Sequence, residues 1–452
     1  MDTALPRPTD PVAPTSLALS EALRFWLKLG FISFGGPAGQ IALMHEELVD
    51  RRRWISEKRF LHALNYCMLL PGPEAQQLAT YLGWLLHRTW GGILAGVLFV
   101  LPSLFIIMAL AWLYMAHGDM PLIAGFFYGI KPAVTALVAQ AACRVGSRSL
   151  KSSWHWGIAA AAFLAIFTLN IPFPLIVIAA AAIGFVGGKL RPEAFGGSSH
   201  EKGNAYRSLG AALIDDDTPT PPHARFSWRG FWRVSLVCLT LWASVMGVLA
   251  TAFGLESPLV QMGWFFTKAA LMTFGGAYAV LPYVYQGAVE HFHWLTATQM
   301  IDGLALGETT PGPLIMVVSF VAFVGGWTKA IFGADSLLLA GVVAAVIATF
   351  FTFLPSFFFI LLGAPFIEST HGKLKFTAPL VGITAAVVGV ILNLAVFFAY
   401  HVIWPRGFAG HMEWPSIAIG LAAGIALLRF KINVIYVIIA AGMMGLLVQL
   451  WR

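Results

Sequence analysis

Charged residues are scarce in this chain of 452 residues: Asp, Glu, Lys and Arg make up 11% of it, against about 25% in a typical soluble domain. Hydrophobic residues make up 58%, and the mean hydropathy is +0.78. This composition excludes a soluble globular protein and predicts an all-α polytopic membrane protein surrounded by lipid. The formal net charge of +7 is modest, and the basic residues lie mostly in short loops, so no nucleic-acid partner is expected.

Cysteines and the common catalytic motifs are also nearly absent. Cys67, Cys143 and Cys238 lie far apart without metal-ligand spacing, so we expect neither a metal site nor a disulfide framework. The chain has no HExxH, no nucleotide-binding loop and no nucleophile with a recognisable base partner. We therefore expect no cofactor and no enzymatic activity, with a membrane-embedded enzyme as the weakest alternative. The first twenty residues are polar and rich in proline, and no cleavable signal peptide is expected there.

One motif interrupts an apolar run: Pro71-Gly72-Pro73, which is followed by Glu74 and Gln76. Two prolines around a glycine cannot continue a helix, because proline lacks an N–H and clashes with the carbonyl one turn back. The helix that restarts after Pro73 has free N–H groups in its first turn. At membrane depth such groups are tolerated only inside protein or beside a wet cavity. The motif is therefore a candidate ligand site.

The chain contains an internal repeat. Three of its features recur at a constant offset of 240 residues (274 − 34 = 294 − 54 = 311 − 71 = 240): Phe34-Gly35-Gly36 as Phe274-Gly275-Gly276, Trp54 as Trp294, and Pro71-Gly72-Pro73 as Pro311-Gly312-Pro313. Further on, Leu101-Pro102-Ser103 returns as Leu354-Pro355-Ser356 at an offset of 253, so 13 residues (253 − 240) are inserted between the two registers. We predict two homologous halves.

A polar stretch joins the halves and sets the expected domain boundaries. It contains Asp215-Asp216-Asp217 and Pro219-Thr220-Pro221-Pro222, which is typical of a solvent-exposed linker. The expected organisation is a polar tail (1–17), a first transmembrane repeat (18–188), a cytoplasmic linker (189–233), a connecting helix (234–253) and a second repeat (254–452).

The distribution of lysine and arginine predicts the sidedness of the chain. The basic loops of the first half should be cytoplasmic, whereas residues 116–121 and 170–174 carry no basic residue. Spans at 90–115, 121–143, 155–170, 172–188 and 234–253 then bring the second half in from the opposite side. There the loop equivalent to Arg51-Arg52-Arg53 reads His291-Phe292-His293. We therefore predict that the repeat is inverted.

Four segments contain the glycine motifs: 18–49, 59–87, 257–290 and 297–328. If each crossed the membrane, the loop from Arg51 to Arg59 would be external, against the positive-inside bias. Hairpins that enter, break at the motif and return keep this loop cytoplasmic, and we favour them. Pairs of broken segments in matching positions of two halves indicate the binding site of a secondary transporter.

These motifs resemble the long-chain chromate ion transporter family. The resemblance covers roughly residues 20–450 and rests on motifs that occur in the same order in both halves. It implies export of the chromate dianion across a bacterial cytoplasmic membrane, chromate resistance, and two halves of opposite orientation. The motifs are Leu29-Gly30-Phe31-Ile32-Ser33-Phe34-Gly35-Gly36-Pro37, Arg51-Arg52-Arg53-Trp54, Leu70-Pro71-Gly72-Pro73, Thr273-Phe274-Gly275-Gly276 and Glu308-Thr309-Thr310-Pro311-Gly312-Pro313.

An anion fits the expected site. Helices that begin after Pro73 and Pro313 would present free N–H groups and about half a positive charge to the cavity. Lys28 and Lys268 each lie six residues before a Phe-Gly-Gly motif; they either supply counter-charge or extend to the membrane interface. The substrate-binding candidates are Lys28, Phe34, Gly35, Gly36, Pro71, Gly72, Pro73, Gln76, Lys268, Phe274, Gly275, Gly276, Pro311, Gly312 and Pro313.

Acidic residues near the motifs are candidates for proton coupling: Glu74, Asp302 and Glu308. The alternatives are that Glu74 caps a helix start and that Glu308 bonds to a neighbouring threonine. Lys131 faces either the cavity or a carboxylate partner. Trp54 and Trp294 are interpreted as anchors at the membrane interface.

The membrane potential favours export of a dianion. Moving one charge across 100 mV is worth about 2.3 kcal/mol, so a dianion leaving a negative interior gains about twice that. We hypothesise electrically driven efflux, with proton antiport as an additional option. Sulfate or another tetrahedral oxyanion remains the alternative substrate, because no residue in the sequence distinguishes the central atom of chromate from that of sulfate. A monomer and a homodimer both remain open.

Overall fold

The structure is a computed structural model that describes residues 17–34, 36–118, 120–195, 212–215, 218–219, 221–274, 276–370 and 377–451. All regular elements in these ranges are helices, and no strand occurs among them. The all-α expectation is therefore confirmed. The tail before residue 17, most of the linker, and Gly35 and Gly275 of the two Phe-Gly-Gly motifs lie outside the described residues.

The first half contains helices that end at the predicted breaks. Those before residue 200 are α1 (Leu19–Ile32), α2 (Gly36–His45), the π-helical turn η1 (Glu46–Arg51), α3 (Glu57–Cys67), α4 (Glu74–His117), α5 (Pro121–Ser149), α6 (Ser153–Leu169), α7 (Phe173–Leu190) and α8 (Pro192–Phe195). The short η2 (Pro222–Ala224) and the long α9 (Trp228–Phe253) then lead to the second half.

The second half repeats this order. Its elements are α10 (Pro258–Leu271), α11 (Ala277–Tyr285), η3 (Gln286–His291), α12 (Ala297–Thr309), η4 (Leu314–Met316), α13 (Val317–Thr328), η5 (Ala334–Ser336), α14 (Leu337–Thr370), α15 (Thr377–Ile403), α16 (Trp414–Leu428) and α17 (Val434–Trp451). Seven described helices are long and apolar enough to cross a membrane: α4, α5, α7, α9, α14, α15 and α17.

Helix α4 is two helices that fold back on each other. The backbone leaves helical geometry at His87 and Arg88 (φ 58°). Beyond this point a Cβ on Gly92 would lie 2.8 Å from the carbonyl of Thr80, so the two parts pack closely side by side. In the second half the same two parts are α13 and α14, separated by residues 329–336. The 13 residues inserted in the second half therefore lengthen the loop at this turn.

Each broken segment of the first half returns to the face from which it starts. Near the start of α1, Glu21 lies 3.5 Å from Arg52, and the ring of Phe25 lies 5.2 Å from that of Trp54 after η1. Around the Pro-Gly-Pro break, the rings of Tyr66 and Tyr81 lie 6.1 Å apart, although one residue precedes the break and the other follows it. The segments 18–49 and 59–87 therefore fold back on themselves as hairpins.

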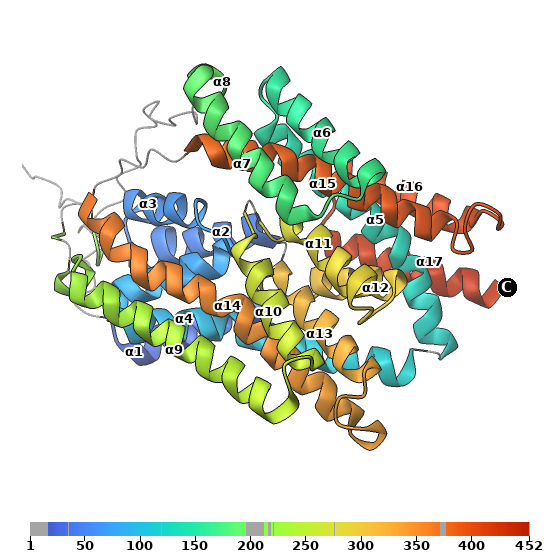
Figure 1. Cartoon of the computed structure of the whole chain (residues 1–452), viewed down its shortest axis with the longest axis horizontal. Coiled ribbons are helices and arrows are strands. Elements are labelled where there is room, and N and C mark those ends of the chain that lie inside the picture. Colours follow the sequence, from blue (N-terminus) through green and yellow to red (C-terminus); the bar gives the residue numbers. More distant parts are fainter. Residues whose placement is uncertain are drawn as a thin grey trace, which may run out of the picture.

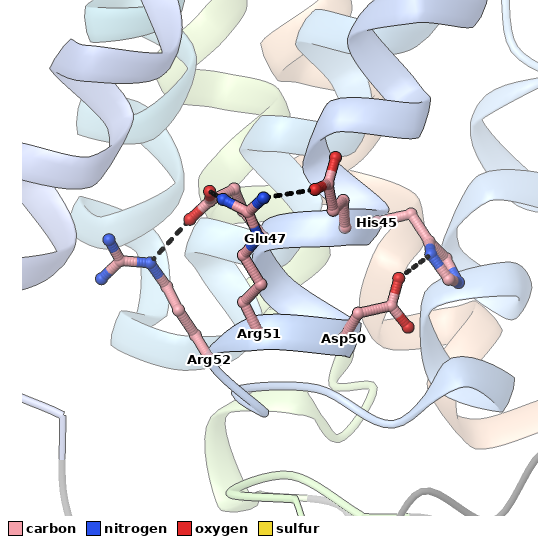
Figure 2. Close-up of polar contacts among 6 residues, drawn as sticks. His45, Glu47, Asp50, Arg51 and Arg52 are labelled. Carbon is pink, nitrogen blue, oxygen red and sulfur yellow. Dashed lines mark hydrogen bonds and ion pairs between the residues drawn. The ribbon is translucent and has the colours of Figure 1, made fainter.

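The basic loop at the end of the first hairpin is held by acidic side chains (Figure 2). Arg51 bonds to Glu46 at 2.6 Å and to Glu47 at 2.9 Å, and Arg52 bonds to the other Glu47 oxygen at 3.2 Å. His45 lies 3.3 Å from Asp50 across the same turn. These pairs fix the π-helical turn on which the loop begins.

The two halves exchange their last helices. Figure 1 shows α15 beside α6 and α7, and α5 beside α16 and α17, in agreement with the extensive contacts between these elements. The contacts are equivalent: Gly129 of α5 packs on the backbone of Gly445 in α17, and Gly382 of α15 packs on that of Gly184 in α7. Glycine allows these helices to approach closely in a membrane, where small residues dominate helix interfaces.

The side chains of Trp54 and Trp294 are buried in the protein and do not face lipid. Their side chains are 3% and 1% exposed, and the indole of Trp294 packs against Phe265 and Phe266. The interpretation of this repeated pair as anchors is wrong. Both residues instead close the base of a hairpin, where they contact the first helix of their own half.

Candidate functional site

The four breaks meet at the centre of the protein through reciprocal hydrogen bonds. The N–H of Gly72 donates to the carbonyl of Thr273 at 2.8 Å, and the N–H of Gly312 donates to the carbonyl of Ser33 at 2.8 Å. Thr273 is the repeat equivalent of Ser33, and each precedes a Phe-Gly-Gly motif. Each Pro-Gly-Pro loop is therefore bound to the other half's Phe-Gly-Gly break.

Helix α4 starts at this centre without a cap. Pro73 precedes its first turn, no side chain caps it, and the first recorded backbone bond is from the N–H of Gln77 to the carbonyl of Pro73. The N–H groups of residues 74–76 thus have no partner within the helix. In the second half, a 3₁₀ turn follows Pro313, and its residues Leu314, Ile315 and Met316 are buried and apolar. The two helix starts occupy equivalent positions in the repeat, but only the first has polar side chains.

Buried polar atoms without a partner gather around the breaks. In the described part of the chain, eight buried side-chain polar atoms have no hydrogen-bond partner. Two belong to His155 and Asp302. The other six are the hydroxyl oxygens of Ser33, Ser103 and Ser356 and the carbonyl oxygens of Gln40, Gln76 and Gln77. Because such atoms are normally satisfied, their concentration at one place indicates that the centre holds a polar ligand or water.

Two of the three glutamines, Gln40 and Gln77, also hold residues of the breaks. The Gln40 amide nitrogen donates to the carbonyl of Gly312 at 2.5 Å and to that of Ser33 at 3.3 Å. The Gln77 amide donates to the carbonyl of Pro71 at 2.7 Å, and that of Gln76 donates to the Thr80 hydroxyl at 3.0 Å. Gln76 thus lies in the first turns of α4, and its role in binding stays a prediction.

The remaining predicted binding residues are divided between the centre and the surface. Phe34 is 38% exposed, whereas Phe274 is half-buried, as are Gly36 and Gly276. Lys28 and Lys268 lie on exposed faces of α1 and α10, and these faces also carry exposed apolar side chains such as Leu27 and Trp264. Gly35 and Gly275 lie outside the described residues. The role of the two lysines stays a prediction.

The three carboxylates occupy different surroundings. Glu308 is buried and accepts a hydrogen bond from the hydroxyl of Tyr278, not from the threonines beside it. Asp302 is 1% exposed, accepts a 2.9 Å bond from Tyr114 and lies 3.7 Å from Lys131. Lys131 therefore faces a carboxylate partner. Glu74 is half-buried in the first turn of α4.

Two arginines bring positive charge toward these carboxylates. Arg144 and Arg148 lie one turn apart near the end of α5, and both are exposed. The charge of Arg144 interacts with Glu308, and that of Arg148 interacts with Glu74. Sequence reasoning treated both only as markers of sidedness.

An ion pair lies beside the second hairpin. Arg59 at the start of α3 bonds to Glu368 near the end of α14 at 3.0 Å, and Tyr81 donates to the other Glu368 oxygen at 2.5 Å. The Arg59 guanidinium also donates to the linker carbonyls of Asp215 and Thr218. The linker, the hairpin and α14 are thus joined at one charged point.

The sequence profile of the chromate transporter family matches residues 20–185 and 260–446, one stretch in each half. The chain belongs to the chromate transporter family. A chromate transport protein of Pseudomonas aeruginosa is 32% identical over 458 aligned positions, which cover 97% of this chain and 95% of that protein. One of Cupriavidus metallidurans is 29% identical over 435 positions, with 94% and 93% covered.

A probable chromate transport protein of Synechococcus elongatus is 29% identical over 411 positions and covers 90% of both chains. No solved structure matches the chain. Chromate transporters are membrane transporters and not enzymes, and together with the apolar helices this membership makes the chain a multi-pass protein of the bacterial cytoplasmic membrane.

In this chain, two of the glutamines at the centre carry no signal in the repeat. Gln40 has Val280 as its repeat equivalent, and Gln77 has Val317, so the repeat gave no signal for either. Ser103 and Ser356 did carry a signal, because both follow a repeated proline.

Proposed function

We propose that this chain exports chromate from the cytoplasm through the centre where the four breaks meet, and thereby confers chromate resistance. The observation that carries the proposal is the cluster of six unpartnered polar atoms beside an uncapped helix start. Hydroxyl and backbone N–H donors with the positive end of a helix suit a tetrahedral oxyanion. Family membership and the names of the relatives support chromate as the substrate.

The proposed transport cycle rests on two halves in inverted orientation. Both ends of the second hairpin contact the linker, through Arg59 and through a bond of His223 to the Trp84 carbonyl. From the linker, α9 runs 26 residues, or about 39 Å, which is enough to cross a bilayer. Residues 253–258 at its far end line a cavity of about 660 Å³ together with residues 329–331, which follow α13. These contacts support hairpins that open to opposite faces.

The membrane potential supplies the proposed driving force. A dianion that leaves a negative interior gains about 4.6 kcal/mol per 100 mV, equivalent to about three decades of concentration. Proton antiport would add to this force. Asp302, Glu308 and Glu74 are the proposed proton carriers. The contact of Asp302 with Lys131 and that of Glu308 with Tyr278 would change when the centre opens.

Uptake of radiolabelled chromate into inverted membrane vesicles tests the function. Vesicles with a positive interior should accumulate chromate only when they contain the protein, and collapse of the potential should stop accumulation. An unchanged rate without potential would contradict electrically driven export. Excess sulfate in the same assay tests the alternative substrate, because strong competition would show that the site does not separate the two anions.

The same vesicles test the residues. A double Lys28→Ala and Lys268→Ala variant should lose uptake if the lysines supply counter-charge, and uptake equal to wild type would remove them from the site. Asp302→Asn, Glu308→Gln and Glu74→Gln should each be assayed with and without an imposed pH gradient. A residue is a proton carrier if the uptake rate of its neutral variant no longer changes with the pH gradient. If all three variants respond to the gradient like wild type, none of these residues carries the proton.

A further inference from the structure

Ser103 and Ser356 occupy equivalent positions behind the two breaks. Each follows a proline inside a long helix, Pro102 in α4 and Pro355 in α14, and they are separated by the repeat offset (356 − 103 = 253). Both side chains are 0% exposed, and neither hydroxyl has a hydrogen-bond partner. The two hydroxyls are therefore a matched pair, one from each half.

Each serine faces the glycine of the other half's Pro-Gly-Pro loop. A Cβ on Gly72 would lie 2.6 Å from the Ser356 hydroxyl oxygen, and a Cβ on Gly312 would lie 3.0 Å from that of Ser103. Both glycines have positive φ, 127° and 101°. The hydroxyls thus lie against bare backbone directly beside the breaks.

Other buried hydroxyls in these helices are satisfied. Thr349 and Thr352 in α14 each donate to the carbonyl four residues back at 2.7 Å, and Ser319 in α13 shares a 2.7 Å bond with Thr349. Leaving a buried hydroxyl without a partner costs free energy that this common back-bond would recover. Ser103 and Ser356 forgo it, so their hydroxyls are free to donate toward the breaks.

We propose that the Ser103 and Ser356 hydroxyls donate hydrogen bonds to oxygens of the transported tetrahedral oxyanion, each at the break that it adjoins. This assignment rests on the proposed function and names the ligands of its site. Each donor adjoins the other half's loop, and binding would be sensed by both halves.

The test compares Ser103→Ala, Ser356→Ala and the double variant with Ser319→Ala. Chromate uptake into inverted vesicles gives KM and the maximum rate, and thermal unfolding of the purified proteins gives Tm with and without chromate. Each single variant should raise KM about tenfold or more, since bonds to charged groups are among the stronger ones. Tm without chromate should stay or rise, because an unsatisfied hydroxyl is removed.

The control should behave in the opposite way. Ser319→Ala breaks a satisfied bond with Thr349, so its Tm should fall while KM stays at the wild-type value. Wild-type KM in the double variant would overturn the assignment and leave the transport function standing. A lower Tm for Ser103→Ala and Ser356→Ala with unchanged KM would give them a structural role, which also overturns it.

Failure of the function itself has a separate signature. If wild-type vesicles take up no chromate, the Tm shift is measured with sulfate and phosphate. A shift with either anion that the double variant loses would support the serine site for another oxyanion. No shift with any of the three anions would overturn both proposals.

Discussion

The N–H of Gly72 lies 2.8 Å from the carbonyl oxygen of Thr273, which belongs to the other half of the chain. The equivalent bond joins Gly312 to Ser33 at the same distance. Reciprocal contacts of this kind are the mark of a two-fold relation, in which residue i contacts j and the equivalent of j contacts the equivalent of i. Neither half completes its own break, so a displacement of one half must alter both loops.

Alanine at Gly72 or Gly312 should damage both stability and transport. A side chain at these positive φ values is strained by about 1–3 kcal/mol. A Cβ at position 72 would also lie 2.6 Å from side-chain atoms of Gln77 and Ser356. Thermal unfolding in detergent should show the lower Tm, and vesicle uptake should fall.

Gly157→Ala is the matched control for these variants. Gly157 lies in α6, and a Cβ there would meet nothing within 4 Å. Alanine should therefore leave uptake unchanged and raise stability by about 0.5–1 kcal/mol, the usual gain for replacing glycine within a helix. If Gly72→Ala behaves like Gly157→Ala, the loop does not need its glycine.

The Arg59 and Glu368 pair should be strongly coupled. Arg59→Gln leaves Glu368 with its charge unpaired in a site that is 7% exposed, which should cost about 3 kcal/mol. Glu368→Gln should cost less, because Tyr81 can still donate to the amide oxygen. Denaturant unfolding of both single variants and the double variant gives the coupling energy.

Glu46→Gln provides the comparison for that cycle. Its bond to Arg51 joins side chains that are 51% and 63% exposed, and exposed pairs contribute at most about 1 kcal/mol. Equal effects of Arg59→Gln and Glu46→Gln would show that the inner pair contributes no more than a surface pair.

Arg144 and Arg148 should attract the anion before it reaches the centre. Both charges are exposed near the end of α5, which packs against the Glu308 helix α12, and exposed positive charge raises the local anion concentration. Arg144→Gln and Arg148→Gln should each raise KM about threefold to tenfold at low salt, and less at high salt. Arg51→Gln serves as a control, since that charge is already paired. An effect independent of salt would exclude steering.

The sequence predicts where the helices of this fold break, but not which residues the breaks contact in the other half. The constant offset between Pro71-Gly72-Pro73 and Pro311-Gly312-Pro313 identifies equivalent breaks, because proline and glycine act on local backbone. It does not reveal that Gly72 binds Thr273 and not its own half's Ser33. That exchange depends on how two complete halves pack, which no local pattern contains.

Other misses have the same cause. Trp54 looks like an interfacial tryptophan in sequence, but a hairpin that returns to its starting face covers it with the first helix. Gln40 lies in a short helix next to a break, and only its bond to Gly312 in the other half shows that it belongs to the site. Gln40 and Gln77 have the apolar residues Val280 and Val317 as their repeat equivalents, so the repeat does not mark them.

Docking of the linker should weaken in acid. Burial lowers the pKa of His223 below its usual 6.5 despite its hydrogen bond to the Trp84 carbonyl, which raises it. The undocked imidazole therefore binds more protons, and the docked state loses stability as pH falls below 6.5. Trypsin cleavage at exposed Arg225, measured relative to the His223→Gln variant at the same pH, should therefore rise as the pH falls. The variant controls for the activity of the protease itself, and identical pH profiles of the two proteins would contradict the prediction.

The inverted orientation makes a prediction for two equivalent loops. Arg51 and His291 both lie at the end of a π-helical turn, and both are exposed. In a variant that lacks Cys67, Cys143 and Cys238, Arg51→Cys should react with an impermeant maleimide only in inverted vesicles, and His291→Cys only in right-side-out vesicles. The positive-inside bias gives the reason, since arginines surround the first site and no lysine or arginine adjoins the second. Labelling of both from one side would mean that the two-fold axis runs across the membrane and not within it.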